Sequence, residues 1–303
     1  MALCDRLEAA RRERESRRDQ LAASTHHHLN NGADAEALRG HARFFIGYLP
    51  RLTARPDQVK QLRQTILNLA VRGKLVPQDP NEATASKLLK RIDPVAIDEM
   101  PFTIPVSWIW VRVCQIADTR LGKMLDKAKN TGKPHRYLRN VNVRWFDFNL
   151  SNVFEMQFRD DELEEFALRS GDVLICEGGE PGRAAVWDER EMGILFQKAI
   201  HRVRFPREVS PHFFLASLRE SADSGRLSQY FTGVGIKHLT GKSLSSFTFP
   251  LPPLAEQFRI VAKVDELMAL CDQLESRLTN AQTEAARLLE SVLHHALQTP
   301  GLD

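Results

Sequence analysis

Cysteine is scarce in this chain of 303 residues, and the four that occur are far apart. They are Cys4, Cys114, Cys176 and Cys271. None belongs to a C-x-x-C pair, and none has a histidine at the short spacing of a zinc ligand set. The sequence therefore predicts neither a disulfide framework nor a metal site.

Long hydrophobic runs are also missing. No stretch of about 18 apolar residues could serve as a transmembrane helix. The first residues lack the basic start, apolar middle and small-residue cleavage site of a secretory signal. Hydrophobic residues make up 43% of the chain, enough for one or two ordinary cores, and the length suggests about two domains. We expect a cytoplasmic protein with no membrane partner.

The chain lacks the motifs of the common catalytic and cofactor sites. It has neither G-x-G-x-x-G nor G-x-x-x-x-G-K-[ST], so no dinucleotide or nucleoside triphosphate pocket is indicated. A Pro-Pro segment superficially resembles the amino-methyltransferase motif, but Leu251 and Pro252 offer no amide or carboxylate. Asp172 and Glu177 lack the following Glu-x-Lys of a metal-dependent nuclease. We therefore predict no catalytic residue and no cofactor.

What the chain does contain is an internal repeat. The octapeptide MALCDRLE at Met1 returns as MALCDQLE at Met268, with Arg6 replaced by Gln273. Repetition of this kind shows that one structural unit is used twice. The cysteine of each copy is interpreted as a small apolar helix residue.

The first 99 residues read as a shortened helical region with a linker. Apolar periodicity predicts helices over residues 1–23, 57–71 and 83–92, and the apolar stretch 44–49 is expected to pack against them. Residues 25–32, which include three consecutive histidines, are predicted to be a turn-rich break. No carboxylate or cysteine stands at ligand spacing there, so a solvated loop is favoured over a metal site.

The last 50 residues read as one long helix, from Leu254 to about Leu297. Its apolar residues recur at intervals of three and four, which is the seam of a coiled coil. They are Leu267, Leu270, Leu274, Leu278, Ala281, Ala285, Leu288 and Val292. Because a lone helix with such a seam is unstable in water, helices 57–71 and 1–23 are its expected partners.

The central region, residues 100–253, alternates in the manner of strands. Strands are predicted at 108–113, 137–143, 172–176, 184–187 and 199–205, with helices at 160–166 and 211–227. The predicted fold is α+β, with one mixed domain built on a mainly antiparallel or mixed sheet and flanked by long helices that form an antiparallel coiled coil.

Basic and amide side chains gather on loops of this central region, although the formal net charge is only +3. Lys and Arg neutralise phosphates, and Asn, Gln and Arg can pair with purine edges. A single such residue is more often a solvated surface group, but their clustering favours DNA binding. The candidate contacts are Lys123, Arg139, Asn140, Asn142, Arg183, Gln197, Lys198, Lys237 and Lys242.

Four segments carry a family resemblance. They are the junction FPLPPLAEQ at 249–257, QLRQTILNLAVRGKLVPQD at 61–79, WIWV at 108–111 and SGDVLI at 170–175. Together they resemble the specificity subunit of type I restriction-modification systems, and the junction is its most specific element.

The resemblance implies a non-enzymatic reader of double-stranded DNA that gives sequence specificity to separate methyltransferase and restriction subunits. The usual family member has two target-recognition domains, which read the halves of a split target and are separated by a coiled-coil spacer. This chain resembles the C-terminal half, with one recognition domain at 100–253. It is then either a truncated product or a half-subunit that pairs with a second copy. The alternative function is an interaction protein that docks on the methyltransferase without reading DNA.

Overall fold

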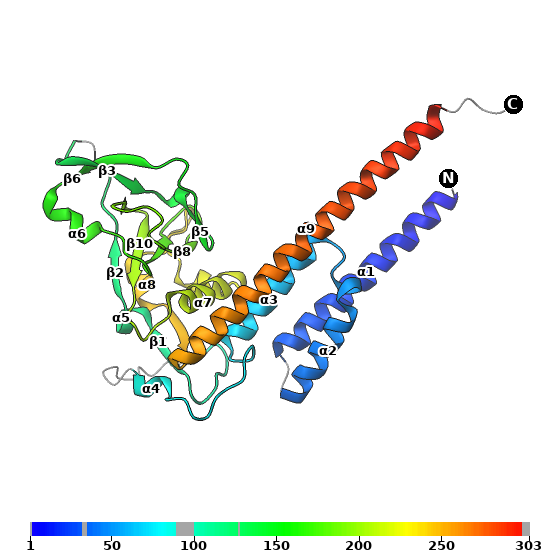
Figure 1. Ribbon diagram of the computed structural model, residues 1–303, viewed down its shortest axis with the longest axis horizontal. Helices are drawn as coiled ribbons and strands as arrows, with labels where there is room; N and C mark the ends of the chain where they lie inside the picture. The colour runs from blue at the N-terminus through cyan, green and yellow to red at the C-terminus, as the bar shows by residue number, and fades with distance from the viewer. Residues whose placement is uncertain (1, 32–34, 89–99, 127, 299–303) are drawn as a thin grey trace. The chain divides into compact units, whose positions relative to one another are not determined.

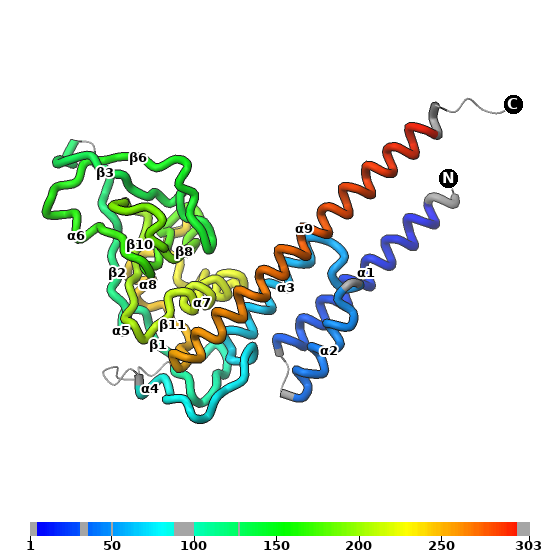
Figure 2. Tube along the Cα trace, viewed as in Figure 1, coloured from blue at the N-terminus to red at the C-terminus, as the bar shows by residue number. Residues whose placement is uncertain are grey.

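The computed structural model describes residues 2–31, 35–88, 100–126 and 128–298 (Figures 1 and 2). They fall into two compact units: residues up to 69 together with those from 264 onwards, and residues 70–263. None of the helices in these segments combines the length and the apolarity needed to cross a bilayer.

The first unit is helical. It contains α1 (Ala2–Asn31), α2 (Ala35–Leu52), most of α3 (Pro56–Val71) and the far part of α9 (Leu254–Gln298). Helices α1 and α2 share a small core that contains Ala22, Leu29, Phe45 and Leu52. This core includes part of the apolar stretch 44–49, which was predicted to pack against the helices and lies within α2.

The predicted turn at residues 25–32 is wrong, because α1 continues to Asn31. His26 is buried: its Nδ1 lies 2.8 Å from the Thr65 hydroxyl of α3, and its ring lies 5.2 Å from that of Phe45. Burial lowers the pKa of His26. These tertiary contacts outweigh the modest helix propensity of His, Thr and Asn, so the helix persists where local sequence indicates a break.

The C-terminal copy of the repeat lies against α3. The Arg63 guanidinium of α3 contacts Asp272 at 2.7 Å and Glu275 at 2.8 Å, and Cys271, the residue before Asp272, is buried. Burial raises the pKa of Cys271, as expected for a packed thiol. The two repeat helices also end at corresponding residues, Asn31 and Gln298.

The predicted coiled-coil seam of α9 is at most partly covered. Leu267, Leu274 and Leu278 are half-buried, whereas the buried Val264 and Cys271 lie off the predicted seam. Farther along, Leu288 and Val292 are 67% and 56% exposed. The heptad pattern therefore identified the helix but not the extent of its packing.

The second unit carries the strands. Helices and 3₁₀ turns in it are α4 (Ala85–Leu88), α5 (Val113–Ile116), η1 (Asn140–Asn142), η2 (Asp160–Glu162), α6 (Leu163–Phe166), α7 (Pro211–Asp223), η3 (Arg226–Tyr230) and α8 (Gly241–Ser246). Its strands are β1 (Ile109–Arg112), β2 (Asp118–Leu121), β3 (Lys133–Leu138), β4 (Val143–Arg144), β5 (Asp147–Phe148), β6 (Phe154–Phe158), β7 (Val173–Cys176), β8 (Ala184–Val186), β9 (Leu195–Phe196), β10 (Ile200–Arg204) and β11 (Thr248–Leu251).

These strands form several small sheets rather than one curved sheet. The largest has the order β2-β10-β7-β8 and is antiparallel throughout. A second sheet, β6-β3-β9, contains the parallel pair β3–β9. Strand β7 is buried along its whole length, between two hydrophobic cores that its alternate side chains enter. The predicted α+β class with mainly antiparallel strands is confirmed.

Some predicted elements need correction. The strand predicted at 137–143 stops at Leu138, and residues 140–142 form the η1 turn instead. The helix predicted at 83–92 is described only as α4; the rest of it, and most of the predicted linker, lie outside the described residues. Alternation was too weak to reveal β2 and β6.

The junction motif at the start of α9 forms hydrogen bonds with neighbouring elements through Glu256 and Gln257. The Glu256 carboxylate accepts a 2.9 Å hydrogen bond from the Trp108 indole. The Gln257 side chain accepts one from the backbone N–H of Ser210, the N-cap of α7, at 2.6 Å, and donates one to the Pro252 carbonyl at 2.9 Å. Burial raises the pKa of Glu256. The motif therefore joins β1, α7 and α9 through buried polar groups, which must be paired to be tolerated.

Candidate DNA-recognition interface

Four loops meet beside the β7 and β10 ends of the largest sheet; we call residues 139–146, 177–183, 197–199 and 232–239 the loop cluster. Backbone hydrogen bonds join them: the Glu177 N–H donates to the Ala199 carbonyl at 2.9 Å, and the Leu239 N–H donates to the Glu177 carbonyl at 2.8 Å. The Arg183 guanidinium donates to the Asn140 carbonyl at 2.8 Å. Loops distant in sequence thus form one surface.

Close approach within the loop cluster requires glycine. A Cβ on Gly178 would stand 3.1 Å from the His238 ring, and one on Gly179 would stand 3.1 Å from the Asn140 amide. Gly179 also has φ of +79°, a left-handed conformation that disfavours other residues. The Gly-rich segment predicted to be a tight loop is tight because two neighbouring loops lie against it.

Lys123 is the predicted contact least available to DNA. It is 9% exposed, and its ammonium donates to Glu162 at 2.5 Å and to the Gln157 carbonyl at 3.1 Å. The ammonium also lies 4.8 Å from the centre of the Phe158 ring. Its charge is neutralised inside the fold, so the interface we propose leaves Lys123 out.

Asn142 is likewise committed to the fold. Its amide donates to the carbonyls of Asn149 and Asn152 at 2.9 and 3.0 Å, and its oxygen accepts from the Arg139 N–H. The side chain is buried and holds the turn that follows β3. A base contact by this amide would require breaking these bonds.

Other predicted contacts are partly engaged. The Arg139 guanidinium donates to the Asn152 carbonyl at 3.0 Å and stacks 3.6 Å from the Phe154 ring centre. Arg183 pairs with Glu180 at 2.9 Å. The Asn140 amide approaches the Gly178 carbonyl at 3.5 Å. Gln197 is half-buried, and its backbone pairs with that of Lys123 in an isolated bridge.

Two predicted lysines, Lys198 and Lys237, are exposed in the loop cluster, and no carboxylate of the described residues forms an ion pair with either. The Lys237 ammonium donates to the Gly233 carbonyl at 2.9 Å. Arg144, which the sequence analysis missed, is a third exposed cation without such a partner. The loop cluster contains five Lys and Arg residues against two Glu, so its charge suits a polyanion.

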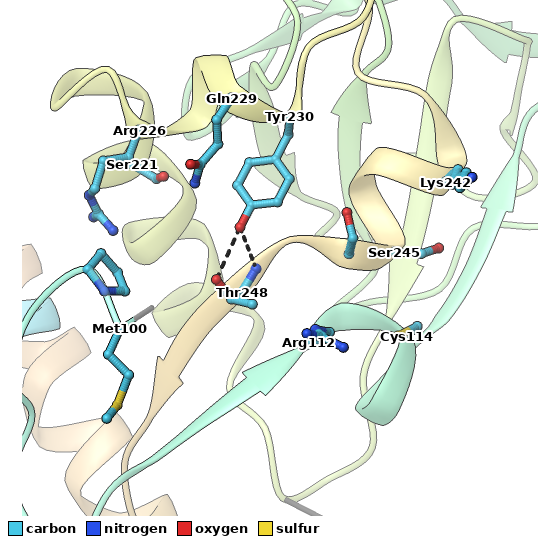
Figure 3. A pocket seen from close by; sticks show the side chains of 12 residues that line it. Met100, Arg112, Cys114, Ser221, Arg226, Gln229, Tyr230, Lys242, Ser245 and Thr248 are labelled. Atoms are coloured by element: carbon cyan, nitrogen blue, oxygen red, sulfur yellow. Dashed lines mark hydrogen bonds between the residues drawn. The ribbon is translucent and has the colours of Figure 1, made fainter. Parts of the chain in front are cut away.

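Lys242 lies outside the loop cluster, in the first turn of α8, where it lines a cavity of about 640 Å³. Arg112 and Arg226 line the same cavity, with several hydroxyl groups. Figure 3 shows the Tyr230 hydroxyl directed at Thr248, 3.1 Å from its hydroxyl, and Lys242 at the edge of the group. The structure therefore does not bring all nine predicted residues together.

The side chains near the loop cluster are suited to binding rather than to chemistry. No three His, Cys, Asp or Glu side chains come together as a metal site within the described segments. Burial raises the pKa of the Cys176 thiol to about 11, so it stays protonated at neutral pH. Asp172, considered above for a nuclease, is 1% exposed and paired with Arg204.

His201 fixes the loop that ends at residue 239. It is buried, and its Nε2 lies 2.9 Å from the Leu239 carbonyl, which can only accept, so this nitrogen carries the proton. Burial lowers the pKa of His201, against the opposing influence of the Leu239 carbonyl and the Glu177 carboxylate.

This gives a pH prediction. The unfolded chain takes up the His201 proton below about pH 6.5 and the folded chain only at lower pH, so this contribution to stability is complete above pH 6.5 and is lost as the pH falls through the folded pKa. Urea unfolding should show that the free energy of unfolding changes less between pH 7.5 and pH 5.5 for His201→Leu than for the parent chain. At pH 7.5 the variant should lose about 1–3 kcal/mol, because the Leu239 carbonyl loses its donor. An identical pH difference in both proteins would contradict this role.

Comparison with known proteins identifies the family. Residues 112–283 match the family described as the type I restriction modification DNA specificity domain. The chain is 28% identical to the Escherichia coli EcoAI specificity subunit over 98% of this chain and 54% of that protein, and 25% identical to the EcoEI specificity subunit over 98% and 55%.

Solved structures share the fold. The HsdS subunit from Thermoanaerobacter tengcongensis matches with a TM-score of 0.52 and 18% identity, over 92% of this chain and 58% of that one. A chain from a structure of type I R-M complex assembly matches with a TM-score of 0.53 and 19% identity, over 84% and 58%. This chain spans about half the length of the curated relatives it matches. The family match covers most of the second unit and the copy of the repeat in α9. The chain therefore belongs to the type I restriction-modification specificity family.

Proposed function

We propose that this chain recognises a specific DNA sequence as the non-catalytic subunit of a type I restriction-modification complex, with base reading assigned to residues 100–253. The observation that carries the proposal is the loop cluster, where Lys198, Lys237 and Arg144 stand exposed and unneutralised beside amide side chains. Such cations hold the phosphate backbone, and neighbouring groups can then reach base edges.

The wider complex follows from the relatives' role as specificity subunits of restriction enzymes. In the proposed complex, separate methyltransferase and restriction subunits carry the reactions, in the cytoplasm. One recognition domain reads one half of a bipartite target. A second copy of this chain is the candidate reader of the other half, with the long helices as spacer.

The test is selection from a randomised duplex DNA library with the purified full chain, followed by affinity measurements at several salt concentrations. We expect an enriched motif and an affinity that falls as salt rises. If the protein retains DNA from the library but no motif is enriched, sequence recognition is contradicted. Methylation sequencing of host DNA, with and without this chain, would then show whether the selected motif is half of a methylated bipartite site.

A second candidate is an interaction protein that docks on the methyltransferase without reading DNA. The observation that favours it is the exposed apolar face of α9, formed by Leu288, Leu289, Val292 and Leu293. Capture of the methyltransferase subunit by a chain that protects no DNA from cleavage would support this candidate. Capture together with a footprint would support the first.

A further inference from the structure

The segment from Thr232 to His238 forms a closed loop with an apolar tip. Two backbone hydrogen bonds close it: the Thr232 N–H donates to the His238 carbonyl at 2.8 Å, and the His238 N–H donates to the Thr232 carbonyl at 2.9 Å. At its tip, Val234 is completely exposed and Ile236 is 74% exposed. Two β-branched apolar side chains thus stand in water on a loop whose ends are held together.

Contacts within the loop hold the conformation of its tip. Gly233 has φ of +101°, and a Cβ there would collide with the Ile236 carbonyl, so the backbone folds tightly across the loop. The Lys237 ammonium reaches back to the Gly233 carbonyl. The exposure of Val234 and Ile236 is therefore built into the loop. Covering such a side chain removes apolar surface from water and is favourable.

The base of this loop belongs to the loop cluster. The His238 ring lies against Gly178, and Leu239 is bonded to Glu177 and His201. The exposed cation Lys237 stands on the tip loop itself, and Lys198 precedes Ala199, whose carbonyl accepts from Glu177 at the base of the loop. An apolar tip on a loop whose lysine has no carboxylate partner among the described residues suits a ligand with a negatively charged backbone and an apolar feature within reach.

We infer that Val234 and Ile236 are specificity residues that contact base edges of duplex DNA and read the C5-methyl group of thymine. The inference rests on the proposed function and adds a direct apolar contact to it. The thymine methyl is the one apolar group that base pairs present in the major groove, and aliphatic side chains recognise it by contact. The cations beside the tip would hold the phosphates and bring the groove to it.

The experiment repeats the library selection with Val234→Ser/Ile236→Ser and with a matched control, Val106→Ser/Met192→Ser. Val106 and Met192 are also almost fully exposed and lie outside the loop cluster. The parent and the control should select the same motif. The tip variant should lose base preference at one or two positions and lose roughly 4-fold in affinity for the parent's motif for each thymine methyl that is no longer covered. Its affinity for unrelated DNA should not change.

The identity of the group that is read is tested with a second library, in which deoxyuridine replaces thymidine. This removes only the methyl groups. The parent should lose preference at the same positions that the tip variant loses in thymidine DNA, and the tip variant should select alike from both libraries. If the parent selects the same motif with or without the methyls, the inference is overturned.

The outcomes separate this inference from the proposed function. A parent chain that enriches no motif defeats the proposed function. A parent motif that the tip variant reproduces in full defeats the inference and leaves the function standing. A tip variant that keeps its motif but no longer captures the methyltransferase subunit shows a protein-docking tip, which also overturns the inference.

Discussion

Asp172→Ala should lower the free energy of unfolding by about 3–5 kcal/mol, the largest stability effect we expect from one substitution. The Asp172 carboxylate contacts the Arg204 guanidinium at 2.6 and 2.7 Å and accepts the Arg169 N–H at 2.8 Å. It is 1% exposed. The truncation leaves the half-buried Arg204 guanidinium without its carboxylate and the Arg169 N–H without its acceptor.

Urea unfolding followed by circular dichroism measures this effect. Asp161→Ala is the matched control, because Asp161 also pairs with an arginine, Arg159, but on the surface. The control should lose far less stability, because exposed ion pairs contribute little. Equal losses for the two variants would show that burial of the Asp172 pair does not determine its contribution.

The second large effect concerns DNA. Lys198→Ala/Lys237→Ala should weaken binding to all sequences by about 10- to 100-fold near physiological salt, because both cations are exposed in the loop cluster. The slope of log affinity against log salt should become shallower by about 2, one unit for each phosphate that a lysine no longer neutralises. Fluorescence anisotropy with labelled duplexes at several salt concentrations gives both quantities.

Two controls sharpen this measurement. Arg207→Ala removes an exposed cation beyond the opposite end of β10, and the affinity should not change. Lys123→Ala removes the buried ammonium paired with Glu162, so it should lower stability and leave the salt slope as it is. An unchanged slope in the Lys198 and Lys237 variant would place the DNA elsewhere on the chain.

The sequence predicted those parts of the fold in which the hydrophobic pattern matches the burial of the side chains. Strand β7 is a short apolar run buried on both faces, so composition alone marked it. The junction at 249–257 was recognisable as a motif. The structure gives a physical role for it, because Glu256 and Gln257 form hydrogen bonds with Trp108, Ser210 and Pro252.

The candidate site was harder to predict, because a side chain's capacity to bond does not reveal the partner it uses. Asn142 could pair with adenine, but it bonds backbone carbonyls instead. Lys123 could hold a phosphate, but its ammonium is bound to the Glu162 carboxylate instead. His26 reads as a loop residue until Thr65 and Phe45 are brought to it from other helices. These choices depend on tertiary neighbours, which local sequence does not contain.

Val234 and Ile236 escaped notice for a different reason. The predicted contacts were chosen for charge or hydrogen-bonding capacity, and aliphatic side chains have neither. Only the backbone bonds between Thr232 and His238 show that these two side chains stand outside the core.

The bonds of Glu256 and Gln257 also determine the rotational phase of α9. With its first turn fixed to Trp108 and Ser210, the helix cannot turn about its own axis, so the direction in which every later side chain points is set at its beginning. Each inserted residue would rotate all that follows by about 100°. One extra residue after Gln257 would therefore turn Ile260 out of its fully buried position in the second unit, whereas seven would nearly restore its direction.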